Sequence, residues 1–146
     1  MLSGSFAPDV DRLLGMDDDI AIYLSKAAES LQSAESEFAH GRYISCANRC
    51  YYACFQAAIA ALLREGVHAS SSYWGHDFVQ AQFVGQLINR PKQYSGDLRR
   101  VLSDNQSLRD QADYEAKLVK QSQANRALAR ARAFVNAVQH RKEANR

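Results

Sequence analysis

Long uncharged apolar runs are absent from this sequence. None approaches the roughly 18 residues that a membrane-spanning helix needs, so we expect no membrane span. Residues 1–19 have neither a basic start nor an apolar core, and we therefore expect no signal peptide. Cysteines number three, all within nine residues, and this odd count indicates a reducing, cytoplasmic setting rather than a secreted disulfide framework.

Several catalytic and structural signatures are also missing. The sequence has no Gly-rich phosphate loop, no HExxH and no nucleophile elbow, which excludes the enzyme classes that these motifs mark. No segment alternates apolar and polar residues with a sustained period of two, so we expect no sheet. No internal repeat or low-complexity tract is present. Two prolines among 146 residues leave room for long helices.

The charge that is present is distributed unevenly. The net charge is +2, but residues 1–40 carry eight acids and two bases, whereas residues 121–146 carry six bases and one acid. A basic last helix could contact phosphates. It could equally be a solvated face that pairs with the acidic first helix. Both interpretations stay open at this point.

Helical periodicity dominates the chain and predicts an all-α fold, an antiparallel up-and-down bundle of about five helices. Residues 1–16 are expected to be a tail or a short helix, and 17–146 one domain. Acids at 17–19 suggest where the first helix begins, Gly41 and Gly66 suggest two helix ends, and Pro91 a third. The predicted helices span residues 17–40, 42–65, 75–89, 95–113 and 122–142.

Three cysteines lie four residues apart on the second predicted helix: Cys46, Cys50 and Cys54. Two thiolates at this spacing could hold zinc, but a tetrahedral site needs four ligands, and no CxxC or nearby histidine supplies them. Free cysteine usually packs as a small apolar residue. We therefore expect no metal site and no cofactor.

Charged and aromatic residues on otherwise apolar helices form the candidate site. Arg49 either has a structural partner such as Asp113 or binds phosphate. His76 either hydrogen-bonds at a helix start or acts on a phosphate or in proton transfer. Arg109 and Asp113 are spaced to form an ion pair beside a core-packed Tyr114, or all three contribute to a nucleotide or nucleic-acid site.

These residues occur within a pattern that resembles the stand-alone HEPN proteins of prokaryotes. The likeness extends from residue 23 to residue 141, and paired tyrosines together with an Arg-x-x-Ala-Asp-Tyr ending are its specific part. It is carried by residues 23–27, 41–43, 47–55, His76, Phe78 and 108–114. The resemblance implies a helical-bundle homodimer that operates beside a small nucleotidyltransferase, often as a toxin–antitoxin pair.

Active relatives in that family are metal-independent ribonucleases, whose Arg and His face each other across a dimer cleft. Arg109 matches the Arg, but Tyr114 stands in the slot of the His after a four-residue gap. A free tyrosine ionises near pH 10 and is a poor general base at neutral pH. The resemblance therefore implies RNA or nucleotide binding by Arg49, Tyr52, His76, Arg109, Asp113 and Tyr114, with weak or no cleavage. The alternative is a non-catalytic subunit that holds the nucleotidyltransferase.

Overall fold

The computed structural model describes residues 2–69, 71, 73–89 and 94–141, and for residues 2–14 and 16 it describes the backbone alone. Within these ranges the chain is helical and contains no strand, so the prediction of an all-α fold is confirmed. The elements are α1 (Leu2–Ala39), α2 (Tyr43–Arg64), α3 (His76–Gln82), η1 (Phe83–Asn89), η2 (Gly96–Leu98), α4 (Val101–Tyr114) and α5 (Gln121–Gln139).

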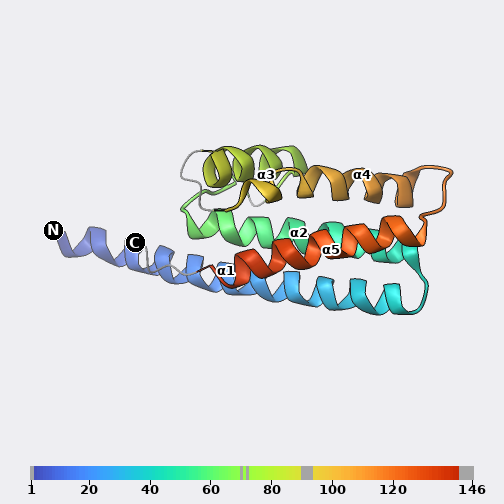
Figure 1. The fold of residues 1–146 in the computed structure, drawn as a ribbon. Coiled ribbons are helices and arrows are strands. Elements are labelled where there is room, and N and C mark those ends of the chain that lie inside the picture. Colours follow the sequence, from blue (N-terminus) through green and yellow to red (C-terminus); the bar gives the residue numbers. More distant parts are fainter. Residues whose placement is uncertain (1, 70, 72, 90–93, 142–146) are drawn as a thin grey trace.

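Helix α2 is the centre of the bundle. It packs against α1, α5 and α4, and α1 also contacts α5 (Figure 1). α3 and α4 follow one another along one side of α2, and α5 returns antiparallel to α4 (Figure 1). Fourteen residues of α2 are buried, among them six alanines that let neighbouring helices approach closely: Ala47, Ala53, Ala57, Ala58, Ala60 and Ala61.

Both glycines that were predicted to end helices do so in the left-handed conformation. Gly41 has φ +74° and Gly66 has φ +82°. After α2, the amide of Gly66 donates to Leu63 O at 3.0 Å and that of Val67 donates to Leu62 O at 2.9 Å. These two bonds form a Schellman motif, which satisfies carbonyls that the helix end would otherwise leave unpaired.

The start of the first helix was predicted wrongly. α1 begins at Leu2, and Asp17, Asp18 and Asp19 are exposed on the continuous helix instead of standing at its N-terminus. Exposed acids are as compatible with a helix interior as with its first turn, so their position did not identify the boundary. α1 crosses the predicted division at residues 16 and 17 without a break, and that domain boundary stays a prediction.

The predicted third and fourth helices also differ in detail. α3 continues as the π-helical segment η1, in which Phe83 and Leu87 are fully buried. Ser95 does not begin α4, because its Oγ accepts from the amide of Asp97 at 3.1 Å and caps the short η2 turn. The predicted end of the last helix at residue 142 lies outside the described residues, and α5 ends at Gln139.

No helix in the described part of the chain is both long enough and apolar enough to cross a bilayer.

We predict that Gly66→Ala lowers the free energy of unfolding by about 1–2 kcal/mol, the usual cost of a side chain at a left-handed position. The space around Gly66 is open, so the loss comes from backbone strain and not from a clash. Denaturant unfolding measures it. Gly85→Ala is the control, because Gly85 lies in η1 without a positive φ, and there alanine should leave stability unchanged or raise it by about 0.5–1 kcal/mol. Equal losses in both variants would contradict the prediction.

Candidate nucleotide or RNA site

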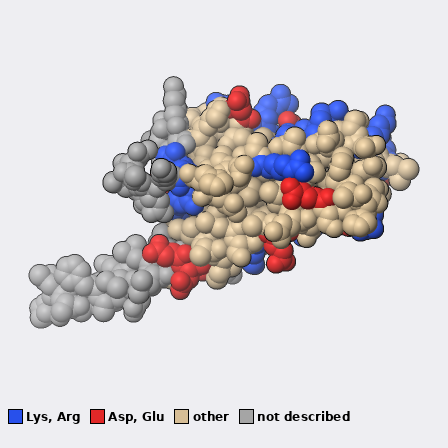
Figure 2. Space-filling view, turned by 60° about the horizontal axis from the view of Figure 1, so that its bottom comes forward, with Lys and Arg blue, Asp and Glu red and all other residues tan. Residues whose placement is uncertain are grey.

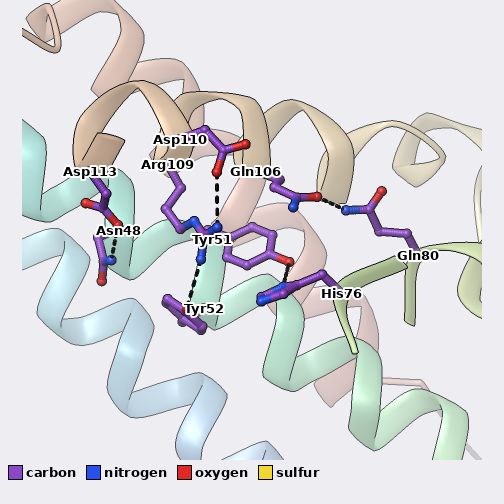
Figure 3. A network of polar contacts seen from close by, with 9 residues as sticks. All are labelled: Asn48, Tyr51, Tyr52, His76, Gln80, Gln106, Arg109, Asp110 and Asp113. Atoms are coloured by element: carbon purple, nitrogen blue, oxygen red, sulfur yellow. Dashed lines mark hydrogen bonds and ion pairs between the residues drawn. The ribbon is translucent and has the colours of Figure 1, made fainter. Parts of the chain in front are cut away.

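Arg109 of α4 points its guanidinium group at the paired tyrosines of α2 (Figure 3). Its Nη1 donates to the hydroxyl of Tyr52 at 2.9 Å, and its Nη2 donates to Oδ1 of Asp110 at 3.0 Å. The residue is only 8% exposed. A charge so far removed from water needs partners. The tyrosine hydroxyl and the carboxylate are two of them.

Aromatic rings supply further compensation for this charge. The guanidinium carbon lies 5.1 Å from the ring centre of Tyr51, 5.7 Å from that of Tyr52 and 5.6 Å from that of Tyr114. All three distances are within the range of cation–π attraction. Burial alone would lower the pKa of Arg109, but its hydrogen bond to Asp110 and its interactions with Tyr52 outweigh that and raise the pKa. The group is therefore a permanent cation in the wall between α2 and α4.

His76, the first residue of α3, joins the same cluster through Tyr51. Its Nδ1 is hydrogen-bonded to the Tyr51 hydroxyl (Figure 3). Its ring centre lies 4.8 Å from that of Phe55. Burial, and then the nearby charge of Arg109, lower the pKa of His76. Burial raises the pKa of Tyr51. At neutral pH the phenol thus keeps its proton and can donate it to Nδ1, which leaves the imidazole proton on Nε2.

A polar hollow of about 500 Å³ adjoins the other end of the cluster, between α1 and α2 beside the end of α4. Arg49 donates from Nε and Nη2 to Oδ1 of Asn48 at 3.0 and 2.8 Å, and its guanidinium carbon lies 5.4 Å from the Tyr52 ring centre. Asn48 in turn donates to Asp113 at 2.9 Å. The hollow is lined by Ser33, Ser36, Glu37, Ile44, Ser45, Asn48, Arg49 and Asp113.

The structure brings all six predicted site residues into one connected cluster. Arg109 touches Tyr52 and Tyr114, and His76 lies with its ring centre 6.4 Å from that of Tyr52. Arg49 stacks on Tyr52 and reaches Asp113 through Asn48. These contacts bear on position alone, so the roles of the six residues in binding stay predictions.

Two purely structural interpretations of the motif are wrong. Asp113 does not pair with Arg109, because Arg109 turns to the adjacent Asp110 and Asp113 accepts from Asn48. Tyr114 does not pack in the core, since it is 75% exposed. The direct structural pairing of Arg49 with Asp113 is replaced by a bridge through the Asn48 side chain.

Sequence reasoning missed four members of the cluster: Asn48, Tyr51, Asp110 and Phe55. Tyr51 offered a signal, because a tyrosine on a helix that is apolar nearly all round is buried and needs a partner for its hydroxyl. Asp110 offered none, since neighbours at i and i+1 do not face each other on a helix.

The cysteine stripe packs inside the bundle. Cys46, Cys50 and Cys54 are free and buried, and Sγ of Cys46 lies 3.8 Å from Sγ of Cys50. The hydrogen bond to Cys46 and burial raise the pKa of Cys50, and burial raises the pKa of Cys54 to about 12. Cys46 differs, because its hydrogen bond with Cys50 lowers its pKa. In the described part of the chain, no group of three or more His, Cys, Asp or Glu side chains is arranged to hold a metal ion.

We predict that His76 makes the stability of the protein fall under mild acid. Its pKa is lowered in the folded chain and is about 6.5 when unfolded, so the unfolded state takes up the proton first. Its contribution is complete above about pH 6.5 and is lost as the pH drops below that value. Thermal melts between about pH 7.5 and pH 5 should show a smaller loss of Tm for His76→Gln than for the wild type.

The control for this measurement is His68→Gln, because His68 is exposed in the loop after α2. It should keep the wild-type dependence on pH. If His76→Gln and His68→Gln lose the same Tm on acidification, the half-buried imidazole of His76 is not the source of the effect.

Comparison with known proteins shows to which family this chain belongs. No curated protein matches this sequence significantly. The family model described as HEPN domain matches residues 20–142, which include the second half of α1 and all the later helices. The match supports a function connected with nucleotides or RNA. With this match over most of its length, the chain belongs to the HEPN domain family.

Proposed function

We propose that this HEPN protein binds RNA or a nucleotide at the cluster around Arg49 and Arg109. The observation that carries the proposal is the continuity between the cationic, aromatic cluster and the 500 Å³ polar hollow beside it. Cations that recognise phosphate, next to exposed rings that stack bases, are the usual means of holding single-stranded nucleic acid.

The two arginines are suited to different tasks. Arg109 is buried and two of its nitrogens are already committed to Tyr52 and Asp110, so it fixes the tyrosines in place. Arg49 donates from Nε and Nη2 to Asn48, but it lies at the wall of the hollow and is only partly buried, so its guanidinium is the one positioned to meet a phosphate. Tyr114, 75% exposed above Arg109, provides a ring face for a base.

The rest of the hollow suits the sugar between phosphate and base. Three serine hydroxyls and the carboxylates of Glu37 and Asp113 line it. Hydroxyls both donate and accept hydrogen bonds, and a carboxylate accepts them, which matches the hydroxyl groups of ribose. The 2′-hydroxyl is the group that distinguishes RNA from DNA. We therefore expect ribose-containing ligands to bind more tightly than their deoxyribose counterparts.

Cleavage by this site is expected to be weak or absent. Tyr114 stands where the family motif has a histidine, and a phenol is a poor base at neutral pH. His76 is a neutral imidazole whose Nδ1 is taken up by Tyr51, so its Nε2–H is suited to donate a hydrogen bond to a phosphate oxygen and not to remove a proton.

We predict that Arg49→Gln weakens binding of a short single-stranded RNA by about tenfold or more, the usual worth of a hydrogen bond to a charged group. Tyr114→Ala should cost a similar factor, because stacking contributes about 1–3 kcal/mol per base, whereas Tyr114→Phe should retain binding. Fluorescence anisotropy measures affinity, and gel analysis of the same mixtures detects cleavage.

The charge-matched control is Arg100→Gln, because the Arg100 side chain is 81% exposed near the opposite end of α4. It should bind as the wild type does. If the wild type, Arg49→Gln and Tyr114→Ala bind the RNA with equal affinity, the proposed site is wrong. Rapid cleavage of the RNA by the wild type would contradict the expected lack of activity.

A second candidate function, a subunit that holds other protein chains, is favoured by exposed apolar residues close to the cluster. Leu118 is 80% exposed and Ile44 is 40% exposed. Both line a hollow of about 490 Å³ at the end of the bundle where α1 meets α2 and α4 meets α5. We propose this surface as the contact with a second copy of the chain or with a nucleotidyltransferase, as in a toxin–antitoxin pair. A two-fold contact would bring two copies of Arg109 and Tyr114 to one groove.

We predict that the protein sediments as a dimer and that Leu118→Glu shifts it towards monomer, because a charge buried in an apolar contact costs solvation energy. Analytical ultracentrifugation over a concentration series measures the shift. Ile22→Glu is the control, since Ile22 is also exposed, at 50%, but lies on the part of α1 remote in sequence from that hollow. A wild-type monomer, or a dimer that both variants leave intact, would contradict the prediction.

A further inference from the structure

A second basic groove lies between α4 and α5. Its volume is about 270 Å³, and its lining includes Ser107 and Gln111 of α4 with Arg126 and Arg130 of α5. At about 100° per residue, Ser107 and Gln111 share one side of α4, whereas Arg109 projects roughly from the opposite side. The groove is therefore separate from the cluster around Arg49 and Arg109.

Arg130 is held in this groove by a residue of the core. Its Nε donates to Oδ1 of Asn105 at 2.7 Å, and Asn105 is completely buried. The Asn105 amide is fixed in turn, because its Nδ2 lies 3.4 Å from Ala127 O and 3.6 Å from Cys54 Sγ. The orientation of the guanidinium is thus set in advance, while Nη1 and Nη2 have no hydrogen-bond partner among the described residues.

The two arginines of the groove also lack an acidic partner in the described part of the chain. Arg126 and Arg130 are four residues apart on α5, a spacing at which like charges destabilise a helix. Asp104 lines the groove too, but its carboxylate lies 3.8 Å from Nη2 of Arg100. Arg132 of the same helix differs, because its Nε contacts Oε2 of Glu35 at 2.9 Å.

An amide pair closes one end of the groove. Gln111 Nε2 donates to Gln123 Oε1 at 3.2 Å and to Leu118 O at 3.0 Å. These hydrogen bonds join α4 to α5 and to the segment that connects the two helices. Ser107 is exposed and adds a hydroxyl between the two helices. The volume of the groove is below the roughly 300–1,000 Å³ of sites for drug-sized ligands, and it suits one small polyatomic group.

We propose that this groove is a second anion site, which binds a single phosphate group through Arg126, Arg130 and Ser107. Planar guanidinium groups match the oxygens of a phosphate, and a pre-oriented guanidinium loses less conformational entropy on binding than a free one. The phosphate comes either from an RNA strand whose other nucleotides occupy the Arg49 cluster or from a free phosphate compound. Only the first source rests on the proposed function.

The test compares Arg126→Gln with Arg132→Gln, which remove the same charge from the same helix. Arg126 is exposed, so its replacement leaves the packing intact. With single-stranded RNA, Arg126→Gln should weaken binding about tenfold and reduce the slope of log K against log salt by about 0.7, the value for one phosphate contact on a single strand. Arg132→Gln should change neither.

A second arm uses inorganic phosphate alone and records the Nε–H resonance of Arg130 by NMR. Phosphate should shift that resonance in the wild type and in Arg132→Gln, and less in Arg126→Gln. An effect in both arms assigns the groove to the RNA strand, and an effect with inorganic phosphate alone assigns it to a free phosphate compound.

The proposal is overturned if Arg126→Gln and Arg132→Gln behave alike in both arms. A different result separates the two proposals. If Arg49→Gln weakens RNA binding but Arg126→Gln does not, and inorganic phosphate does not shift the Arg130 resonance, the groove is not an anion site and the proposed function stands. Absence of RNA binding by the wild type, together with a phosphate shift that Arg126→Gln reduces, would refute the proposed function and leave the groove as a site for free phosphate.

Discussion

The buried positive charge of Arg109 is the constraint on which the rest of the site depends. A guanidinium group taken out of water is tolerated only where hydrogen bonds and ring faces replace its hydration. Tyr52 and Asp110 provide the hydrogen bonds, and Tyr51 and Tyr114 provide ring faces. Because these partners lie on both α2 and α4, the charge fixes how the two helices are aligned along each other (Figure 3).

That constraint divides the cluster into a rigid part and a part that faces outwards. Tyr51 and Arg109 are buried, and α2 is lined with alanines that pack closely against its neighbours. Tyr114 and Asp113 are exposed at the last residues of α4. Figure 2 shows a face on which uncharged residues predominate, and the charged residues on that face are scattered among them. Recognition by this molecule would therefore depend on positioned single charges more than on a broad field.

Much of this arrangement was predictable from the sequence, for physical reasons that are local. Gly41 and Gly66 mark helix ends because few other residues adopt a positive φ, and the apolar α2 had to lie centrally. The pairing of Arg109 was not predictable in the same way. Spacing favoured Asp113 at i+4, but the buried guanidinium points at α2, and from that position it reaches Asp110. The packing of α4 against α2 directs the Arg109 side chain and so decided its partner, and the sequence of one helix does not reveal that packing.

The proximity of Arg109 to His76 has a thermodynamic consequence. The fixed charge of Arg109 adds to burial in keeping the imidazole unprotonated. An anion placed beside the two groups would offset that repulsion and raise the proton affinity of the ring. Ligand binding and proton uptake would then be linked, so that the affinity for an anion increases as the solution becomes more acidic. Through this linkage, one arginine would make the site respond to the acidity of its surroundings.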